Sequence, residues 1–256
     1  MIFHLNQTYS LKTSWGKAFR APTFNDLYWP QGGNKELKPE IGQSFEILLS
    51  SQTEKVLSQL GFFYRNVKNL ISWAPLGKDG NWQPFNLNKY SGRGIELENK
   101  FFFSPNISME LNYTGVWGKE KNKELTYQDY FTGETKFKEE TRKARFTPEN
   151  NLHLKLLLTP TSRIKFAVFG SWTDPRVNYY PNYNNYPEIS YQEKIIPSHW
   201  NFDFSSELKL YSSFYLTFSV YNLLNDKTNL QFGNQLKDLD FPNPGRRIKT
   251  SLKFQI

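Results

Sequence analysis

The most constraining feature of this sequence is a two-residue alternation of apolar and polar side chains that recurs along the chain. Between Ile107 and Trp117 the odd positions are mostly large and apolar, whereas Ser108, Glu110 and Asn112 are polar. Successive side chains of a β-strand point to opposite faces, so the pattern predicts strands with one apolar and one polar face. Helical periodicity reaches a comparable length nowhere. Similar alternation occurs at 95–103, 152–158, 200–210 and 214–220.

The connections between the predicted strands alternate strictly in length, which predicts a barrel with two different ends. Outer-membrane barrels have short periplasmic turns and longer extracellular loops. We therefore expect an all-β fold, an antiparallel transmembrane β-barrel of about ten strands that begins and ends on the periplasmic side, with residues 1–256 as one domain. The predicted strands are 7–18, 39–52, 57–70, 85–103, 106–118, 143–158, 162–173, 197–210, 213–223 and 246–256; the long loops are 19–38, 71–84, 119–142, 174–196 and 224–245.

Composition agrees with a polar-lined barrel. Hydrophobic residues make up only 38% of the chain, yet aromatic residues reach 17%. No apolar run approaches the roughly 18 residues that a membrane helix needs, which leaves a closed barrel as the way to span a bilayer. A soluble sandwich or propeller would also alternate, but neither predicts the short–long rhythm of connections. Five tryptophans near predicted strand ends suit the headgroup level of a bilayer: Trp15, Trp73, Trp117, Trp172 and Trp200.

Catalysis, metal binding and nucleic-acid binding find little support. The chain has no cysteine, and no HExxH, P-loop or nucleophile-elbow motif is present. The net charge of +8 is spread over the whole chain, which does not suggest nucleic acid. We therefore expect no catalytic residue, no metal site and no cofactor. The alternative is a free-standing ten-stranded outer-membrane barrel that acts as a protease-like enzyme or a small pore, although the long loops contain no histidine.

Residues 15–40 resemble a characteristic segment of TonB-dependent outer-membrane receptors, G-x-A-F-R-A-P-x-x-x-x-L-Y followed by G-N-x-x-L-x-P-E. Further similarity follows in the family's order at 61–71, 94–96, 221–227 and 244–247. The resemblance covers essentially the whole chain, in register with the C-terminal portion of the family's barrel. The matching positions are Gly16, Ala18, Phe19, Arg20, Ala21, Pro22, Leu27, Tyr28, Gly33, Asn34, Leu37, Pro39 and Glu40.

This resemblance implies an energy-coupled receptor of the cell outer membrane that takes up a metal chelate. The similarity is greatest to the cobalamin-receptor branch, although siderophore receptors share most of the motifs. The family has a 22-stranded barrel, an N-terminal plug and a TonB-contacting box ahead of the plug. Neither plug nor box is seen in these 256 residues, nor is a secretory signal. We therefore expect a C-terminal barrel portion that meets the TonB complex only through a missing N-terminal region and does not transport by itself.

The loop at 174–196 is the predicted ligand-binding region. Its aromatic rings and amides, held by prolines, suit the capture of a large, partly apolar metal chelate. An ordinary surface loop with aromatic packing is the alternative. The loop at 119–142 is a weaker candidate, whose Lys and Glu side chains serve solvation or contact anionic lipopolysaccharide. The candidate ligand-binding residues are Tyr179, Tyr180, Tyr183, Tyr186 and Tyr191 in the first loop, with Tyr127 and Tyr130 in the second.

The family-motif residues are interpreted as structural. Arg20 and Glu40 bracket the loop at 19–38, and we expect them to pair near the barrel wall, because an unpaired buried charge is costly. The same structural interpretation covers Pro22, Tyr28, Asn34 and Pro39.

Overall fold

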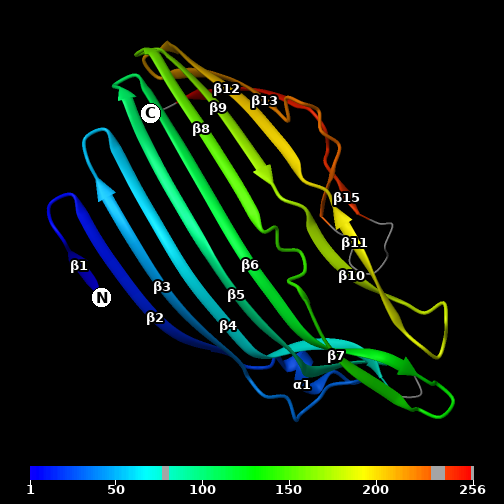
Figure 1. Ribbon diagram of the computed structural model, residues 1–256. Coiled ribbons are helices and arrows are strands. Elements are labelled where there is room, and N and C mark those ends of the chain that lie inside the picture. Colours follow the sequence, from blue (N-terminus) through cyan, green and yellow to red (C-terminus); the bar gives the residue numbers. More distant parts are fainter. Residues whose placement is uncertain (77–80, 232–239, 255–256) are drawn as a thin grey trace.

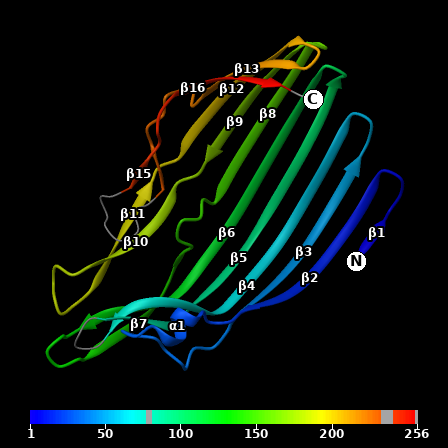
Figure 2. The same ribbon diagram turned by 180° about the vertical axis from the view of Figure 1, so that it is seen from behind.

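The computed structural model describes residues 1–76, 81–231 and 240–254. Within these residues the chain forms a large antiparallel sheet of twelve strands, two separate two-stranded sheets and a short helix, α1 (Phe24–Tyr28). The large sheet curves like a section of a barrel wall (Figures 1 and 2). Short turns lie at its upper end in Figure 1, and the long connections gather at the lower end. No helix in the described part has the length and hydropathy to cross a membrane.

Every predicted strand has a counterpart in the large sheet. Neighbours along the chain pair in antiparallel fashion, so the sheet is a meander. The counterparts are β2 (Tyr9–Arg20), β3 (Glu40–Gln52), β4 (Val56–Leu76), β5 (Asn81–Ser104), β6 (Ile107–Gln128), β8 (Asn150–Thr161), β9 (Ile164–Thr173), β12 (His199–Tyr211), β13 (Phe214–Tyr221) and β16 (Arg247–Phe254). Residues 255–256 of the last predicted strand lie outside the described residues.

The large sheet has more strands than the ten or so predicted, and within the described part of the chain it does not close. Two further strands, β1 (Ile2–His4) and β7 (Thr135–Lys143), join the sheet, which makes twelve. Among the described residues the sheet ends at β1 on one side and at β16 on the other, and these two strands do not pair. A barrel closes only when its edge strands meet in the required stagger. The observed architecture is therefore an open section of wall.

The long connections contain more regular structure than the sequence pattern predicted. β4 and β5 pair beyond residue 70, and β6 continues to Gln128, where it pairs with β7. The segment predicted as loop 174–196 is a hairpin of β10 (Arg176–Asn182) and β11 (Ser190–Ile196). The strand predicted from 143 begins at Asn150. Small strands β14 (Asn229–Gln231) and β15 (Phe241–Pro242) lie within 224–245; residues 77–80 and 232–239 of these predicted loops lie outside the described part.

The two faces of the wall differ as the alternation predicted. One outward row runs Phe101, Met109, Leu156, Val168, Phe204, Val220 and Ile248 across seven neighbouring strands. Nearer the loop end, Trp15, Phe45 and Tyr64 are paired in sequence across β2, β3 and β4, and all three are exposed. Trp73 differs from the other predicted interfacial tryptophans. Its indole N–H donates to Asp26 at 3.1 Å, inside the loop region.

Candidate functional site

Two hairpins pack against each other at the loop end of the wall. The first is formed by the end of β6 with β7, and the second by β10 with β11 (Figure 1). Backbone hydrogen bonds join them, since the amide of Gln128 donates to Pro187 O and that of Ile189 donates to Thr126 O, each at 2.9 Å. We call these two hairpins the hairpin layer.

The hairpin layer contains most of the buried apolar side chains in the described part of the chain. Tyr180 and Ile196 pack together and are 6% and 1% exposed. A side chain this deeply buried contributes to packing and cannot contact a ligand from solution. For Tyr180, the structure therefore supports the alternative of aromatic packing over ligand contact. The other buried apolar residues of the layer and its connections are Leu125, Ala144, Val177 and Ile189.

An arginine joins two more of the predicted ligand-binding tyrosines to the other hairpin. The guanidinium of Arg142 lies 4.6 Å from the ring centroid of Tyr179 and 5.3 Å from that of Tyr191. Its Nη2 also donates to Glu124 Oε2 at 2.6 Å. Burial raises the pKa of Tyr191 to about 12. Both rings thus serve as cation–π partners inside the layer.

The tips of the two hairpins form a different aromatic group that faces solvent. Tyr130 and Tyr186 stack with ring centroids 5.7 Å apart and planes 5° apart, and the amide of Tyr130 donates to Tyr186 Oη at 2.9 Å. Both rings are exposed, as are Tyr183 and Phe131. We call these four residues the tip cluster. Tyr127, by contrast, is half-buried below it, with Lys136 Nζ 4.6 Å from its ring centroid.

The family-motif segment forms a second polar cluster at the loop end, built around α1. Thr23 is the helix N-cap: its hydroxyl accepts from the amide of Asp26, whose carboxylate accepts from the amide and hydroxyl of Thr23. Burial acts to raise the pKa of Asp26. Hydrogen bonds from Thr23 and Trp73 and the nearby charge of Arg20 outweigh burial, so the pKa lies below its ordinary value.

Arg20 and Glu40 form a bidentate ion pair across the last ladder position of β2 and β3. Arg20 Nε and Nη2 donate to the two carboxylate oxygens of Glu40 at 2.7 and 2.5 Å. Glu40 Oε1 also accepts from the amide of Ile71 at 2.9 Å. These charge-assisted hydrogen bonds join the ends of β2 and β3 to the extension of β4.

The remaining motif residues shape the same loop. Asn34 Nδ2 donates to the carbonyl of the buried Pro84 at 3.0 Å, and Pro39 O accepts from Asn69. Pro22 directly precedes the helix cap, and the ring of Tyr28 is exposed beside Phe24. At Gly33 a Cβ atom would lie 2.6 Å from Leu27 O, so the backbone can pass this close to α1 only with glycine at this position.

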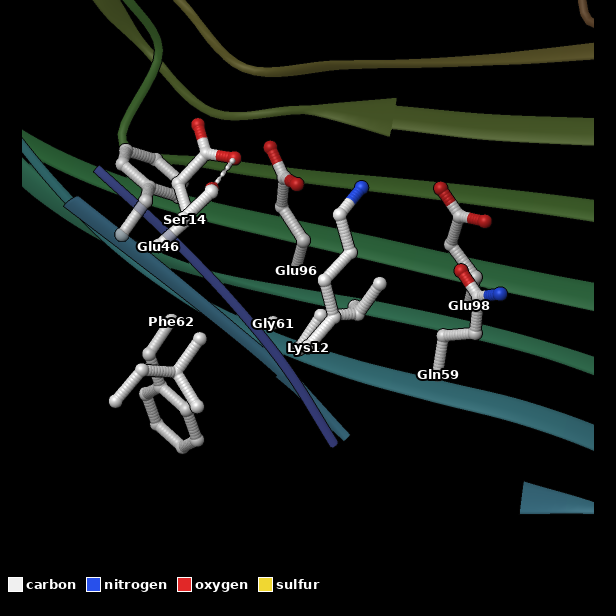
Figure 3. Close-up of a pocket in the computed structure, with 11 residues that line it drawn as sticks. Lys12, Ser14, Glu46, Gln59, Gly61, Phe62, Glu96 and Glu98 are labelled. Atoms are coloured by element: carbon white, nitrogen blue, oxygen red, sulfur yellow. Dashed lines mark hydrogen bonds between the residues drawn. The ribbon is translucent and has the colours of Figure 1, made fainter. Parts of the chain in front are cut away.

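The inner face of the wall carries two shallow polar cavities. The first, of about 150 Å³, is drawn in Figure 3, where Lys12, Gln59, Glu96 and Glu98 point to one side of the sheet and Phe62 to the other. The second, of about 360 Å³, is lined by His153 and Glu110 among other residues. Lys100 and Lys155 lie 3.1 and 3.4 Å from Glu110. Among the described residues, no group of three or more acidic or histidine side chains is placed to hold a metal ion.

Two features of the loop end were missed by the sequence analysis. The Thr23–Asp26 cap has a local signal, because Thr-x-x-Asp is a capping-box pattern. The Arg142–Glu124 pair has none: its members lie 18 residues apart in a polar stretch, and only the β6–β7 ladder brings them together.

An open antiparallel wall with an apolar outer face, a polar inner face and long connections at one end defines a section of an outer-membrane β-barrel. The family model described as TonB dependent receptor-like, beta-barrel, matches residues 1–223. The chain belongs to this family, and the resemblance seen in the sequence is thereby confirmed. It is an outer-membrane protein, and the family consists of receptors and transporters rather than enzymes.

Similarity to individual proteins covers only parts of them. Over 88 residues the chain is 42% identical to the vitamin B12 transporter BtuB of Vibrio vulnificus (strain YJ016), which is 34% of this chain and 14% of that protein. Its fold matches the pyoverdine outer membrane receptor FpvA from Pseudomonas aeruginosa PAO1 with a TM-score of 0.74, 16% identity, and coverage of 100% of this chain and 35% of that one. A ferric enterobactin receptor PfeA mutant from the same species gives a TM-score of 0.73 at 18% identity, covering 99% and 39%.

Proposed function

We propose that this chain provides barrel wall and ligand-contacting hairpins of an outer-membrane receptor that takes up a metal chelate, either a cobalamin or a ferric siderophore. The family supports a receptor rather than the protease-like or pore alternatives. The curated relative named above transports vitamin B12, and the solved structures include receptors for pyoverdine and ferric enterobactin. TonB would supply the energy, as in the family as a whole.

The observation that carries the ligand-contact proposal is the exposed stack at the end of the hairpin layer. Tyr130 and Tyr186 are held in a parallel stack by a backbone-to-hydroxyl hydrogen bond, yet both rings face solvent. A preorganised pair of rings loses little conformational entropy when a flat, partly apolar chelate binds. Of the seven tyrosines predicted from the sequence, we therefore assign contact to Tyr130, Tyr183 and Tyr186, and packing to Tyr127, Tyr179, Tyr180 and Tyr191.

The test is equilibrium binding to the full chain in detergent micelles, with vitamin B12, ferric enterobactin and ferripyoverdine as separate probes. The variant carries Tyr130→Ala and Tyr186→Ala together. Loss of two anchoring rings should weaken binding of the accepted chelate about tenfold or more. Tyr211→Ala is the matched control, because this exposed tyrosine lies at the turn end of β12, and it should leave affinity unchanged.

The result separates two parts of the proposal. Binding of one chelate that survives the double substitution would reject the tip cluster as its contact and leave the receptor function standing. Binding of none of the three probes would contradict the proposed ligand class itself.

A further inference from the structure

The outer face of β6 changes from aromatic to basic just beyond the membrane-facing row. From Trp117 onward the odd positions Lys119, Lys121 and Lys123 are exposed, while Gly118 and Asn122 between them are buried. Because side chains alternate along a strand, these lysines lie on the same outer face as Trp117.

The ladder register brings further lysines beside them. Lys89 of β5 is directly opposite Lys121, and Lys143 of β7 is directly opposite Lys119. Lys68 continues the outer face of β4 two positions beyond Asn66, and it is exposed. We call these six residues the outer basic patch: Lys68, Lys89, Lys119, Lys121, Lys123 and Lys143.

Lysines of neighbouring strands face each other in two pairs, Lys89 with Lys121 and Lys119 with Lys143. Like charges directly opposite in an antiparallel ladder are destabilising. Glu139 lies 2.5 Å from Lys121 and Glu149 lies 3.0 Å from Lys143. Among the described residues, Lys68, Lys89, Lys119 and Lys123 have no ion-pair partner within 4.0 Å, although Glu139 also acts on Lys89 and Lys123 from farther away, which leaves six lysines against two carboxylates. The patch therefore retains an excess of positive charge that an external anion would neutralise.

Apart from Glu139 of β7, which contacts Lys121, and Glu149, which contacts Lys143, the carboxylates near the patch are on the other face. Glu46 and Glu96 line the cavity of the inner face, and Glu120 accepts hydrogen bonds from Arg145 at the inner side of the hairpin layer. These inner acids have cations of their own face beside them, since Glu46 lies 3.5 Å from Arg65 and Glu110 lies 3.1 Å from Lys100. An outward patch cannot be neutralised by the inner acids, because the sheet lies between them.

The position of the patch along the strands indicates which layer of the membrane it contacts. The outward row Trp15, Phe45, Tyr64 and Trp117, completed by Arg93, is continuous across β2 to β6. Aromatic rows of this kind lie at the interface between hydrocarbon and headgroups. The patch begins two residues beyond Trp117 and ends six residues beyond it, roughly 7 to 20 Å along the strand at about 3.4 Å per residue. Because barrel strands tilt by roughly 35–45°, this interval lies about 5 to 15 Å above the aromatic row, so the patch begins in the headgroup layer on the loop side and extends beyond it.

We propose that the outer basic patch binds the phosphate groups of phosphorylated lipid in the outer leaflet. The patch spans β4 to β7, about 14 Å at roughly 4.8 Å between strands, which fits several headgroup phosphates held in a bilayer better than one free ion. Each lysine close to an anionic membrane surface adds attraction, and the attraction is screened by salt.

The test measures lipid bound to the full chain by native mass spectrometry, with phosphatidylcholine bilayers containing diphosphoryl lipid A. One variant carries Lys68→Gln, Lys89→Gln, Lys119→Gln and Lys123→Gln, the four patch residues that have no ion-pair partner among the described residues. We expect its affinity for lipid A to fall about tenfold or more. The matched control changes four exposed lysines elsewhere to glutamine and should stay within about twofold. These control positions are Lys55, Lys227, Lys249 and Lys253.

Two further arms need no substitution, so the test holds even if the variant fails to fold. The unsubstituted chain should prefer diphosphoryl lipid A to its dephosphorylated form, and inorganic phosphate at the same phosphate concentration should not displace the lipid. Equal affinity for the dephosphorylated lipid, displacement by inorganic phosphate, or undiminished binding by a folded four-lysine variant would each overturn the proposal.

Discussion

The wall and the hairpin layer are stabilised in different ways. In the described part of the chain, Phe63 is the buried hydrophobic residue of the wall, whereas Leu125, Val177, Tyr180 and Ile196 are buried in the hairpin layer. The wall instead exposes large apolar side chains on its outer face. The hairpin layer excludes water with its own side chains, and the wall needs lipid to cover its outer surface.

This difference shows why similar β-ladders carry different sequences. On the wall a polar residue faces inward and an apolar residue faces lipid, so the two-residue alternation is clean. In the hairpin layer the protected face packs on a second hairpin and includes the charged pair Arg142–Glu124, while the open face is lysine-rich. The effect of a substitution on stability should therefore depend on whether protein or lipid covers the side chain.

The largest effect is expected in the centre of the hairpin layer. Ile196→Ala removes a side chain that is 1% exposed and should lower the local free energy of unfolding by about 2–5 kcal/mol. Hydrogen exchange of residues 176–196 in detergent micelles would report this change. The neighbouring Ile195 is 56% exposed, so Ile195→Ala is a matched control with an expected effect below about 0.5 kcal/mol. Equal effects from the two changes would mean that the hairpins do not pack as described.

The second prediction tests the wall at the middle of β9. Val168 lies in the apolar outward row, whereas Ala167 beside it is on the inner face opposite Ser205. Val168→Arg should cost about 2–4 kcal/mol in a bilayer, because a charge near the midplane of the lipid face is poorly solvated. Ala167→Arg should cost less than about 1 kcal/mol, since the inner face is polar. Urea unfolding of the two variants in phosphatidylcholine vesicles would measure the difference, and a larger cost for Ala167→Arg would reverse the assigned faces.

The same difference explains how far the sequence could be interpreted. All ten predicted wall strands have counterparts. Along a wall strand, side chains alternate between the lipid and the polar interior, so the two-residue pattern in the sequence is regular. In the hairpin layer the partner is another hairpin, and polar side chains such as Asn122 and Gln128 are buried there. A sequence of that kind resembles a polar loop, so the β6–β7 and β10–β11 ladders were not predicted.

The surroundings of the candidate ligand-binding tyrosines could not be predicted residue by residue. The tyrosine-rich segment does lie at the loop end, yet Tyr180 and Tyr183, three residues apart, differ completely in exposure. Tyr180 lies within the β10–β11 ladder opposite Gln192, whereas Tyr183 follows the end of β10, and the sequence alone does not locate that end or the contact with the first hairpin. The Arg20–Glu40 pair was easier to anticipate, because the two residues end adjacent strands and face each other in the ladder.

The smallest predicted effect concerns the cap of α1, which belongs to neither the wall nor the hairpin layer. Asp26→Asn should weaken the loop by about 1 kcal/mol, because the variant loses charge-assisted hydrogen bonds to Thr23 and Trp73. The pKa of Asp26 lies below its ordinary value of 3.8 in the folded chain. The stabilisation is therefore complete above about pH 3.8 and is lost as the pH falls through the lower, folded-state pKa.

Hydrogen exchange of residues 23–34 would measure this loss of loop stability, which should amount to about 1 kcal/mol. The exchange is followed from about pH 5 downward and corrected for the intrinsic exchange rate. The Asp26→Asn variant should show no such titration, because it has no carboxylate at this position. Asp129→Asn serves as a control in the β6–β7 turn, where Asp129 accepts from the amides of Phe131 and Thr132. It should change exchange at that turn and leave residues 23–34 unaffected. If the Asp26→Asn variant still loses protection against exchange as the pH falls, the titrating group would be Glu40, whose carboxylate binds Arg20, the arginine that also lies near Asp26.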